Sequence, residues 1–245
     1  IANLLPIAAD EKVTSMIRVP EFDEEKYLVM VTKQGIIKRI SLNAYNTARK
    51  GGLIALELNE GDELAWVRLT DGNQQVIVAT KNGLAIRFEE TDVRPMGRQA
   101  RGVKAISLRE GDCVVGMCVV TNDDLILTAS ETGFGRISNV SDYRLQSRGG
   151  KGITNYHTEK YGNVAAVSAV KLDEDIIIIS QEGVIIRIAA DTVRICNRPS
   201  KGVTLMRIGE NDKVVTVARA PHEDSESEKT EETAEEENSE GEYCP

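Results

Sequence analysis

The stretch R-G-V-K-A-I-S-L, residues 101–108, returns along this chain with a period of fifty residues. Its counterparts are G-G-L-I-A-L-E-L from Gly51, K-G-I-T-N-Y-H-T from Lys151 and K-G-V-T-L-M-R-I from Lys201. A second series of glycines, each ending a tetrapeptide such as T-K-N-G, steps by 48, 50 and 50 residues. The first series is Gly52, Gly102, Gly152 and Gly202, and the second is Gly35, Gly83, Gly133 and Gly183. Two independent markers therefore define four repeats.

Each repeat contains about four short strand candidates, which in the second repeat are residues 63–70, 75–80, 83–88 and 103–108. The run before each T-K-N-G-like turn is apolar without alternation, which is typical of a strand buried on both faces. The glycine of the turn suits a hairpin that requires positive φ. Because a single four-stranded sheet must stack on neighbours to bury its faces, the period predicts an all-β, propeller-like array of four-stranded blades.

We expect the folded body to span residues 1–221, with repeats at about 11–62, 63–112, 113–162 and 163–212. Flanking strands are expected at 1–6 and 212–220, as the end and the start of partial repeats, so the sequence is interpreted as part of a longer protein.

Residues 222–245 are predicted to form a disordered acidic tail. Between Glu223 and Glu242, eleven acidic residues and one lysine give a balance of −10, which leaves 28 acidic and 29 basic residues, or +1, elsewhere. A segment with so few apolar residues buries too little surface to fold alone.

Composition argues against several classes of function. The sequence has no signal peptide and no apolar span of 18 residues, which favours a cytoplasmic location without membrane contact. With only two histidines, a metal centre or a histidine general base is not expected. We therefore predict no catalytic residue, no metal site and no cofactor within this sequence. The four cysteines, interpreted as reduced thiols without metal-binding spacing, are Cys113, Cys118, Cys196 and Cys244.

Positive charge returns at fixed positions in one connecting segment, just before the glycine of the first series. In the last three repeats, arginine stands eight and four residues before that glycine, and arginine or lysine stands one residue before it. The first repeat has Ala44 and Ala48 at two of these places, and its cations are displaced nearby. Such segregation is expected to attract a polyanion, with an ordinary solvated loop as the alternative. The eleven cations are Arg49, Lys50, Arg94, Arg98, Arg101, Arg144, Arg148, Lys151, Arg194, Arg198 and Lys201.

One of these segments, Y-R-L-Q-S-R-G-G-K-G at residues 143–152, interleaves glycines with cations. Glycine lets backbone N–H groups approach phosphate oxygens closely, and neighbouring cations add charge-assisted contacts. The spacing differs from that of a Walker loop. A flexible turn with incidental charges is the alternative interpretation. The candidate DNA-contacting residues of this loop, besides Arg144, are Gln146, Arg148, Gly149, Gly150, Lys151 and Gly152.

The chain resembles the C-terminal DNA-wrapping domain of the A subunit of DNA gyrase, a bacterial type IIA topoisomerase. The resemblance covers residues 1 to about 220 and rests on N-L-L-P (3–6), T-K-Q-G (32–35), D-V-R-P-M-G (92–97) and Q-S-R-G-G-K-G (146–152). The last motif is similar to the gyrase A box, usually Q-R-R-G-G-K/R-G, with Ser147 replacing one arginine. In the family the full box lies in the first blade, whereas this motif lies in a later one.

The resemblance implies a β-pinwheel, with four full repeats and partial repeats at both ends, that binds, bends and wraps double-stranded DNA without sequence specificity. It implies as partners the rest of the gyrase A subunit, together with the gyrase B subunit, in a heterotetramer. It also implies ATP and Mg²⁺ in the parent holoenzyme, which introduces negative supercoils into DNA. The cleaving tyrosine and the ATP site of such an enzyme belong to parts outside this sequence, and its location is the bacterial cytoplasm, on the nucleoid.

Two other functions stay open. One is the equivalent domain of topoisomerase IV, which resembles this array but binds DNA without strong wrapping. The other is a propeller-type scaffold whose cations bind an acidic protein. The intact G-G-K-G favours gyrase over topoisomerase IV, and the repetition of loops suited to phosphate favours DNA over an acidic protein.

Removal of the residues after Pro221 is expected to tighten DNA binding, most strongly at low salt. The tail carries about ten excess negative charges, which compete with DNA for the basic segments and are screened as salt increases. Fluorescence anisotropy of a labelled duplex with the full and the truncated chain measures the difference. Equal affinities at every salt concentration would instead indicate a solubilising tail that makes no contact.

Overall fold

The computed structural model describes residues 13–19, 21–47 and 52–222. The expected strand at 1–6, the cations Arg49 and Lys50, and the acidic tail from Glu223 onward lie outside these residues. Short strands dominate the described chain, and its helices are one α-helical turn, α1 (Thr158–Tyr161), and four 3₁₀ turns. The 3₁₀ turns are Leu42–Tyr45, Glu90–Asp92, Val140–Asp142 and Ala190–Thr192.

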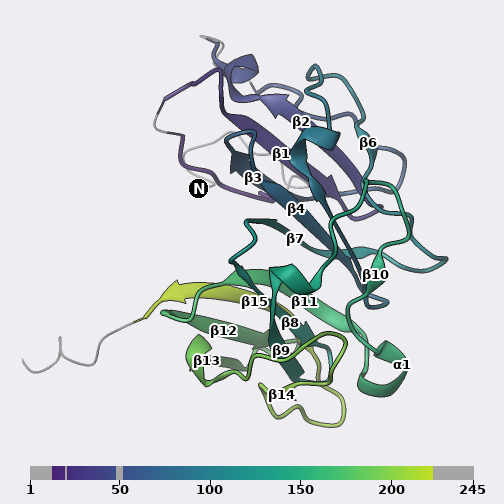
Figure 1. Ribbon diagram of the computed structural model, residues 1–245, viewed down its shortest axis with the longest axis vertical. Coiled ribbons are helices and arrows are strands. Elements are labelled where there is room, and N and C mark those ends of the chain that lie inside the picture. The colour runs from purple at the N-terminus through teal and green to yellow at the C-terminus, as the bar shows by residue number, and fades with distance from the viewer. Residues whose placement is uncertain (1–12, 20, 48–51, 223–245) are drawn as a thin grey trace, which may run out of the picture.

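The strands form four antiparallel sheets; in Figure 1 the first lies at the top, the second in the middle, and the third and fourth beside each other at the bottom. In spatial order, sheet one is β3 (Leu64–Thr70), β1 (Tyr27–Thr32), β2 (Ile36–Ser41) and β6 (Val103–Lys104). Sheet two is β7 (Val114–Val120), β4 (Gln75–Thr80), β5 (Leu84–Glu89) and β10 (Ile153–Thr154). Sheet three is β11 (Val164–Val170), β8 (Leu125–Ser130), β9 (Phe134–Asn139) and β14 (Val203–Thr204), and sheet four is β15 (Val214–Pro221), β12 (Glu174–Ser180) and β13 (Ile185–Ala189).

The all-β propeller-like fold is confirmed, but one repeat does not make one blade. The sequence places four strand candidates in the second repeat: 63–70, 75–80, 83–88 and 103–108. The first and last of these supply β3 and β6, and both pair with the hairpin of the first repeat, β1 and β2. Each sheet therefore combines a hairpin with strands from later in the chain. The strand expected at 212–220 is β15, which completes sheet four as β3 completes sheet one.

The two glycine series meet where the strands are exchanged between repeats. Gly102, just before β6, lies against sheet one, and a Cβ atom added to it would come within 2.6 Å of the Ile37 carbonyl oxygen. Gly83, in the hairpin turn of sheet two, would place a Cβ 2.3 Å from the Tyr156 carbonyl oxygen, just beyond β10. Both residues also have positive φ. The glycines are therefore required because two backbones approach closely at each joint.

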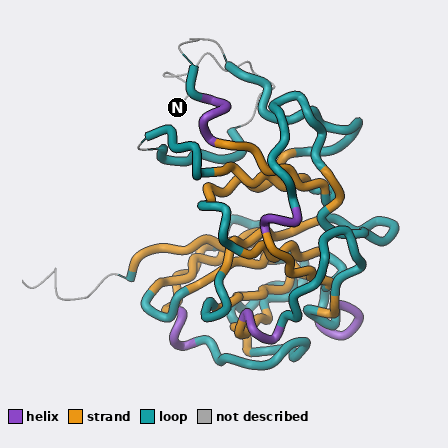
Figure 2. The backbone as a smooth tube through the Cα atoms, turned by 45° about the horizontal axis from the view of Figure 1, so that its top comes forward, coloured by secondary structure: helices purple, strands orange, loops and turns teal. Residues whose placement is uncertain are grey.

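The sheets share a common inner side. β3, β7, β11 and β15 each lie at one edge of a sheet; β3 contacts β7, β7 contacts β11, and β11 contacts β15. Gly116 on β7 permits one of these approaches, because a Cβ atom added to it would lie 2.6 Å from the Val167 carbonyl oxygen on β11. The opposite edge, formed by the two-residue strands β6, β10 and β14, faces outward. Figure 2 shows the long loops that run between the strand layers.

Carboxylates of the E-G-D-like turns hold the hairpin tips. The Asp112 Oδ1 atom accepts hydrogen bonds from the backbone N–H groups of Asn82 and Cys113, both at 2.9 Å. Asp62 and Asp212 make the corresponding pairs of bonds in sheets one and four. Acidic residues away from the cationic segments thus have a structural role at the inner strands.

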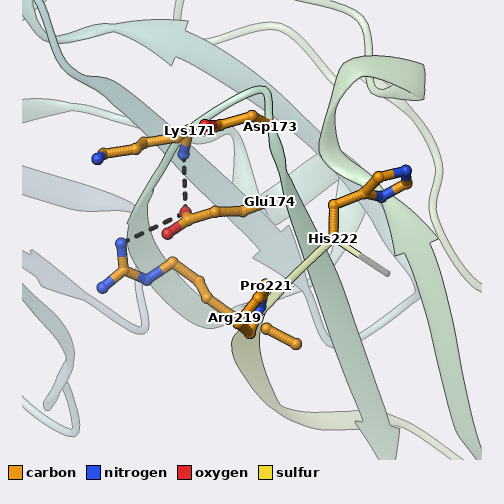
Figure 3. Close-up of a pocket in the computed structure, with 7 residues that line it drawn as sticks. Lys171, Asp173, Glu174, Arg219, Pro221 and His222 are labelled. Carbon is orange, nitrogen blue, oxygen red and sulfur yellow. Dashed lines mark hydrogen bonds and ion pairs between the residues drawn. The ribbon is translucent and has the colours of Figure 1, made fainter. Parts of the chain in front are cut away.

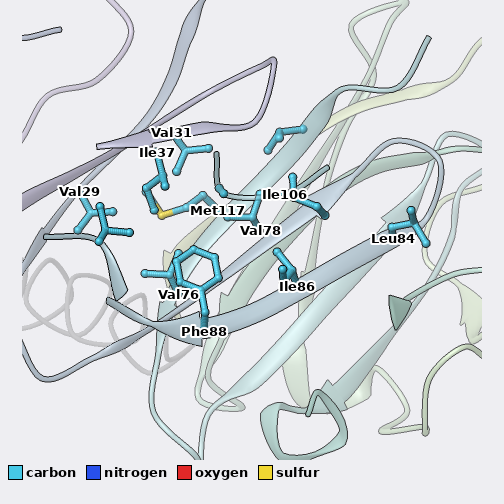
Figure 4. Close-up of a cluster of buried hydrophobic side chains, with 13 residues drawn as sticks. Val29, Val31, Ile37, Val76, Val78, Leu84, Ile86, Phe88, Ile106 and Met117 are labelled. Atoms are coloured by element: carbon cyan, nitrogen blue, oxygen red, sulfur yellow. The ribbon is translucent and has the colours of Figure 1, made fainter. Parts of the chain in front are cut away.

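Hydrophobic side chains fill the spaces between consecutive sheets. In the first such core, Val31 and Ile37 from sheet one face Val78, Phe88 and Met117 from sheet two (Figure 4). All five are at most 2% exposed. Burial of this apolar surface supplies the main favourable free energy that holds neighbouring blades together.

Substitution of Phe88 by alanine is expected to lower the free energy of unfolding by about 3–5 kcal/mol, because it leaves a cavity in the core between sheets one and two. Phe88 is fully buried, whereas Phe22 is 46% exposed. Phe22→Ala serves as the matched control and should cost less than about 1 kcal/mol. Urea unfolding followed by circular dichroism measures both, and equal losses would contradict this account of the core.

Candidate nucleic-acid interface

The predicted cations lie in three crossing segments, defined as residues 90–104, 140–154 and 190–204. Each crossing segment leaves a hairpin through a 3₁₀ turn and ends in the short outer strand of the preceding sheet. Since those strands form the outward edge, the three segments together make an outer rim. In Figure 1 its first two parts end at β6 and β10, on the right, and its third part ends at β14, at the bottom. The repeat therefore does place its charges along one edge of the array.

Arginines eight residues before the glycine of the first series stand free on the outer rim. Arg94, Arg144 and Arg194 each follow a buried residue that fixes the segment to the body. Their side chains are exposed and have no ion pair or hydrogen bond within the described chain. All three guanidinium groups are consequently available to an external anion.

Two arginines four residues before that glycine act as clasps between blades. Arg148 donates from Nε to the Asp92 carbonyl oxygen (3.0 Å) and from Nη1 to that of Lys104 (3.2 Å). Arg198 repeats this arrangement with the carbonyl oxygens of Asp142 (2.7 Å) and Thr154 (2.8 Å). In both cases the side chain ties the two ends of the preceding crossing segment together. The sequence analysis predicted these residues only as DNA ligands. In the structure, Nε and Nη1 of each side chain donate to carbonyl oxygens within the domain.

Cations immediately before the glycine have three different environments. Arg101 pairs with Glu57 at 2.6 Å on the surface, and this hydrogen bond lowers the pKa of the glutamate. The Lys201 ammonium lies 3.5 Å from the centre of the Phe134 ring, a cation–π contact. Lys151 is exposed and has no partner within the described residues. Of these three, Lys151 is the most available to a ligand.

The loop at 146–152 is anchored from below. The Gln146 N–H group donates to the Arg87 carbonyl oxygen (3.0 Å), and the Gly149 N–H group donates to that of Ala105 (2.6 Å). Gly152 occupies the same kind of joint as Gly102, with 2.4 Å between a built Cβ and the Ala85 carbonyl oxygen. A Cβ built on Gly150, by contrast, would make only ordinary contacts. The path of this loop is therefore constrained by the fold, whatever binds outside.

The first repeat differs because its connecting segment is shorter. Gly35 and Gly52 are 17 residues apart, whereas the corresponding glycines of the other repeats are 19 apart. Counted from the hairpin glycine, Asn46 is the counterpart of Arg94, so the alanines found by counting backward are not the equivalent positions. This segment therefore has an asparagine at the position of the rim arginine, and the predicted cations Arg49 and Lys50 lie in the part that is not described.

Sequence reasoning missed the buried cations in the outer hairpin strands, which in the described chain are Lys38, Arg39, Arg87 and Arg136, and three of them bind backbone carbonyl oxygens. Lys38 donates from Nζ to the carbonyl oxygens of Ala55 (2.7 Å), Arg98 (2.5 Å) and Ala100 (3.0 Å). Arg87 reaches those of Val140 and Tyr143, and the fully buried Arg136 reaches that of Asn155. Burial lowers the pKa of all three. A basic residue within an otherwise apolar strand was the available signal.

One hollow of the described surface lies at the end of β15 (Figure 3). It has a volume of about 770 Å³ and is lined by residues of both signs. Its Glu174 carboxylate accepts from the Lys171 N–H group (3.0 Å) and lies 3.5 Å from Arg219 Nη1. Because these charges satisfy one another, the hollow offers no net attraction to an anion.

Other kinds of site are not evident among residues 13–19, 21–47 and 52–222. No cluster of three or more His, Cys, Asp or Glu side chains there has a metal-binding arrangement. Burial raises the pKa of the Cys118 thiol to about 11, which keeps it protonated and poorly nucleophilic. None of the helices in that part of the chain is long and apolar enough to cross a membrane.

The family model and the sequence relatives that match this chain belong to the same family. The family model described as DNA gyrase C-terminal domain, beta-propeller, matches residues 26–71, 74–120, 124–171 and 174–221. Each match covers a hairpin and the inner strand of one sheet. The A subunit of DNA gyrase is 53% identical over 104 residues in Clostridium acetobutylicum and 55% identical over 104 residues in Halalkalibacterium halodurans. Each match covers 42% of this chain and only 12% of the relative.

Two solved structures share the arrangement. The C-terminal domain of DNA topoisomerase IV superposes with a TM-score of 0.84 at 27% identity, covering 96% of this chain and 74% of that one. The DNA gyrase A C-terminal domain superposes with a TM-score of 0.78, also at 27% identity, covering 89% of this chain and 74% of that one.

Arg198→Ala is expected to lower the free energy of unfolding by about 1–2 kcal/mol, because two backbone carbonyl groups lose a charged donor. Arg194→Ala removes the same charge from the same crossing segment but breaks no contact, so it should change stability by less than about 0.5 kcal/mol. Urea unfolding of the two variants checks the clasp. Equal stabilities would show that the two hydrogen bonds of Arg198 contribute nothing to the fold.

Proposed function

Because this chain belongs to the DNA gyrase C-terminal domain family, we propose that it binds double-stranded DNA along the outer rim and bends it without reading its sequence. The observation that carries the proposal is the row formed by Arg94, Arg144 and Arg194. Consecutive sheets present these free guanidinium groups at equivalent positions. A duplex following the rim would therefore meet a similar phosphate-binding group at each blade.

Energetics favour a rim of this kind over a single site. Smooth bending of ~20–30 bp costs on the order of 1–6 kcal/mol, which several phosphate contacts must offset. Besides the three free arginines, Lys104 and Lys151 are exposed on the crossing segments. Base readout is not part of the proposal, since the rim consists of loops and the longest α-helix in the described chain has four residues.

Within a whole gyrase, the proposed role is to wrap DNA and present it to the strand-passage machinery, so that negative supercoils are introduced at the expense of ATP. The partners would be the rest of the gyrase A subunit, together with the gyrase B subunit, in the cytoplasm. ATP and Mg²⁺ would act elsewhere in that ATP-dependent topoisomerase. The proposal assigns no catalytic residue to this chain, which matches only 12% of the length of its gyrase relatives.

A topoisomerase IV-like role is the second candidate, and one observation favours it: that enzyme's C-terminal domain has the higher TM-score, 0.84 against 0.78. Sequence relatives at 53% and 55% identity support gyrase instead. The two roles differ in wrapping. A nicked DNA circle can be ligated in the presence of the chain and its linking number then measured. A chain that only binds DNA should leave the linking number equal to that of a circle closed without protein, whereas a chain that wraps DNA should change it.

Affinity for duplex DNA is expected to fall linearly as salt increases on logarithmic axes, because rim cations displace condensed counterions. Arg144→Ala should reduce the slope by about 0.9, with the fold unaffected. Anisotropy titrations of duplexes from about 20 to about 100 bp, in two unrelated sequences, measure the slope and its dependence on length. Glu110→Ala, in the exposed turn that leads to the inner strand β7, is the control and should not lower the slope. Binding that is insensitive to salt, or restricted to one sequence, would contradict the proposal.

A further inference from the structure

Each crossing segment is held by a buried or half-buried side chain that binds a carbonyl oxygen of the segment. These subsurface donors are Lys38, Ser107 and Tyr156, and each donates to at least one carbonyl oxygen of a crossing segment. They come from different positions in the repeat and have different chemistry. In each case the bound carbonyl oxygen of the outer rim points toward the donor, that is, toward the body of the domain.

Lys38 acts on the segment before Gly102. Its side chain is fully buried, and its ammonium group binds the carbonyl oxygens of Arg98 and Ala100 from inside. In a trans peptide the N–H group points opposite to the C=O group. The N–H groups of Gln99 and Arg101 therefore point away from the body, and neither has a partner within the described chain.

Ser107 does the same for the glycine-rich loop. Its hydroxyl group donates to the Gly149 carbonyl oxygen (2.8 Å), and its backbone N–H group donates to that of Gly150 (2.8 Å). The N–H groups of Gly150 and Lys151, on the opposite sides of these two peptides, consequently face away from Ser107. Neither N–H group has a partner among the described residues.

Tyr156 acts on the third segment. Its ring is 1% exposed, and its hydroxyl group donates to the Lys201 carbonyl oxygen at 3.0 Å. Burial raises the pKa of this phenol, so it remains a donor at neutral pH. The Gly202 N–H group on the far side of that peptide has no partner among the described residues.

We propose that Lys38, Ser107 and Tyr156 are positioning residues that turn the rim peptides so that their outward N–H groups bind the phosphate oxygens of DNA. This inference rests on the proposed function and adds a contact that charge counting does not include. Backbone N–H groups are common phosphate ligands in proteins, and successive ones make a concave anion site. The arginines and lysines of the rim attract the duplex, and the oriented peptides fix where its phosphates lie.

Tyr156→Phe tests the inference most cleanly, because it removes one buried hydroxyl group and changes no charge. It should weaken duplex binding about threefold to tenfold at every salt concentration, the loss expected for one charge-assisted hydrogen bond. The slope against salt should stay the same, since no cation is lost. Ser107→Ala should have a similar effect through another segment, and the double variant should combine the two because the segments are separate.

Thr32→Val is the control. Thr32 is 2% exposed, and its hydroxyl oxygen accepts a hydrogen bond from the Ile36 N–H group (3.1 Å) within the hairpin of sheet one, so it contacts no rim carbonyl group. This variant should bind DNA like the parent chain, and thermal unfolding compares its stability with that of Tyr156→Phe. Equal affinities of these two variants would overturn the inference, because any effect would then reflect stability alone. If the parent chain showed no salt-dependent DNA binding, the proposed function itself would fail, and the inference with it.

Discussion

The joint at which a two-residue strand closes the sheet of the preceding hairpin is the constraint on which the rest of this structure depends. At that joint, β6 pairs with only Ile36 and Ile37, yet the backbone before it approaches so closely that Gly102 has no room for a side chain. A pairing of two residues is weak by itself. It holds because the chain that enters it is fixed at its other end by the hairpin of the next sheet, so each blade restrains its neighbour.

The outer rim is a consequence of that exchange. To reach the edge of the preceding sheet, the chain must cross the gap between blades on the outside, and this crossing exposes a loop in every repeat. The loop then needs internal partners for its carbonyl groups, which Arg148, Arg198, Lys38 and Tyr156 provide. One chemical type, the basic side chain, therefore both links the blades and faces outward.

Several features of the fold follow from sequence alone, and others do not. The period, the hairpin glycines and the phase of the cations are local patterns, so the all-β array and its charged edge are predictable from them. Which strands pair is not local, because the hydrophobic pattern of residues 63–70 suits either neighbouring hairpin. Arg194 and Arg198 are likewise indistinguishable in sequence, and only the distances to Asp142 and Thr154 separate a free cation from a clasp.

Affinity and curvature have different origins in this domain. In the proposed function, the free arginines would set the attraction for DNA, which acts over a Debye length and does not depend on the fine position of each side chain. The curvature of DNA bound in this way would follow the arrangement of the blades, which the clasps and the exchanged strands hold through short contacts. The pairing of Arg101 with Glu57, and of Lys201 with an aromatic ring, reduces what a count of charges would assign to binding. A related chain could therefore keep its net charge and still lose wrapping, if the substitutions fell on the clasps or on the buried donors beneath the rim.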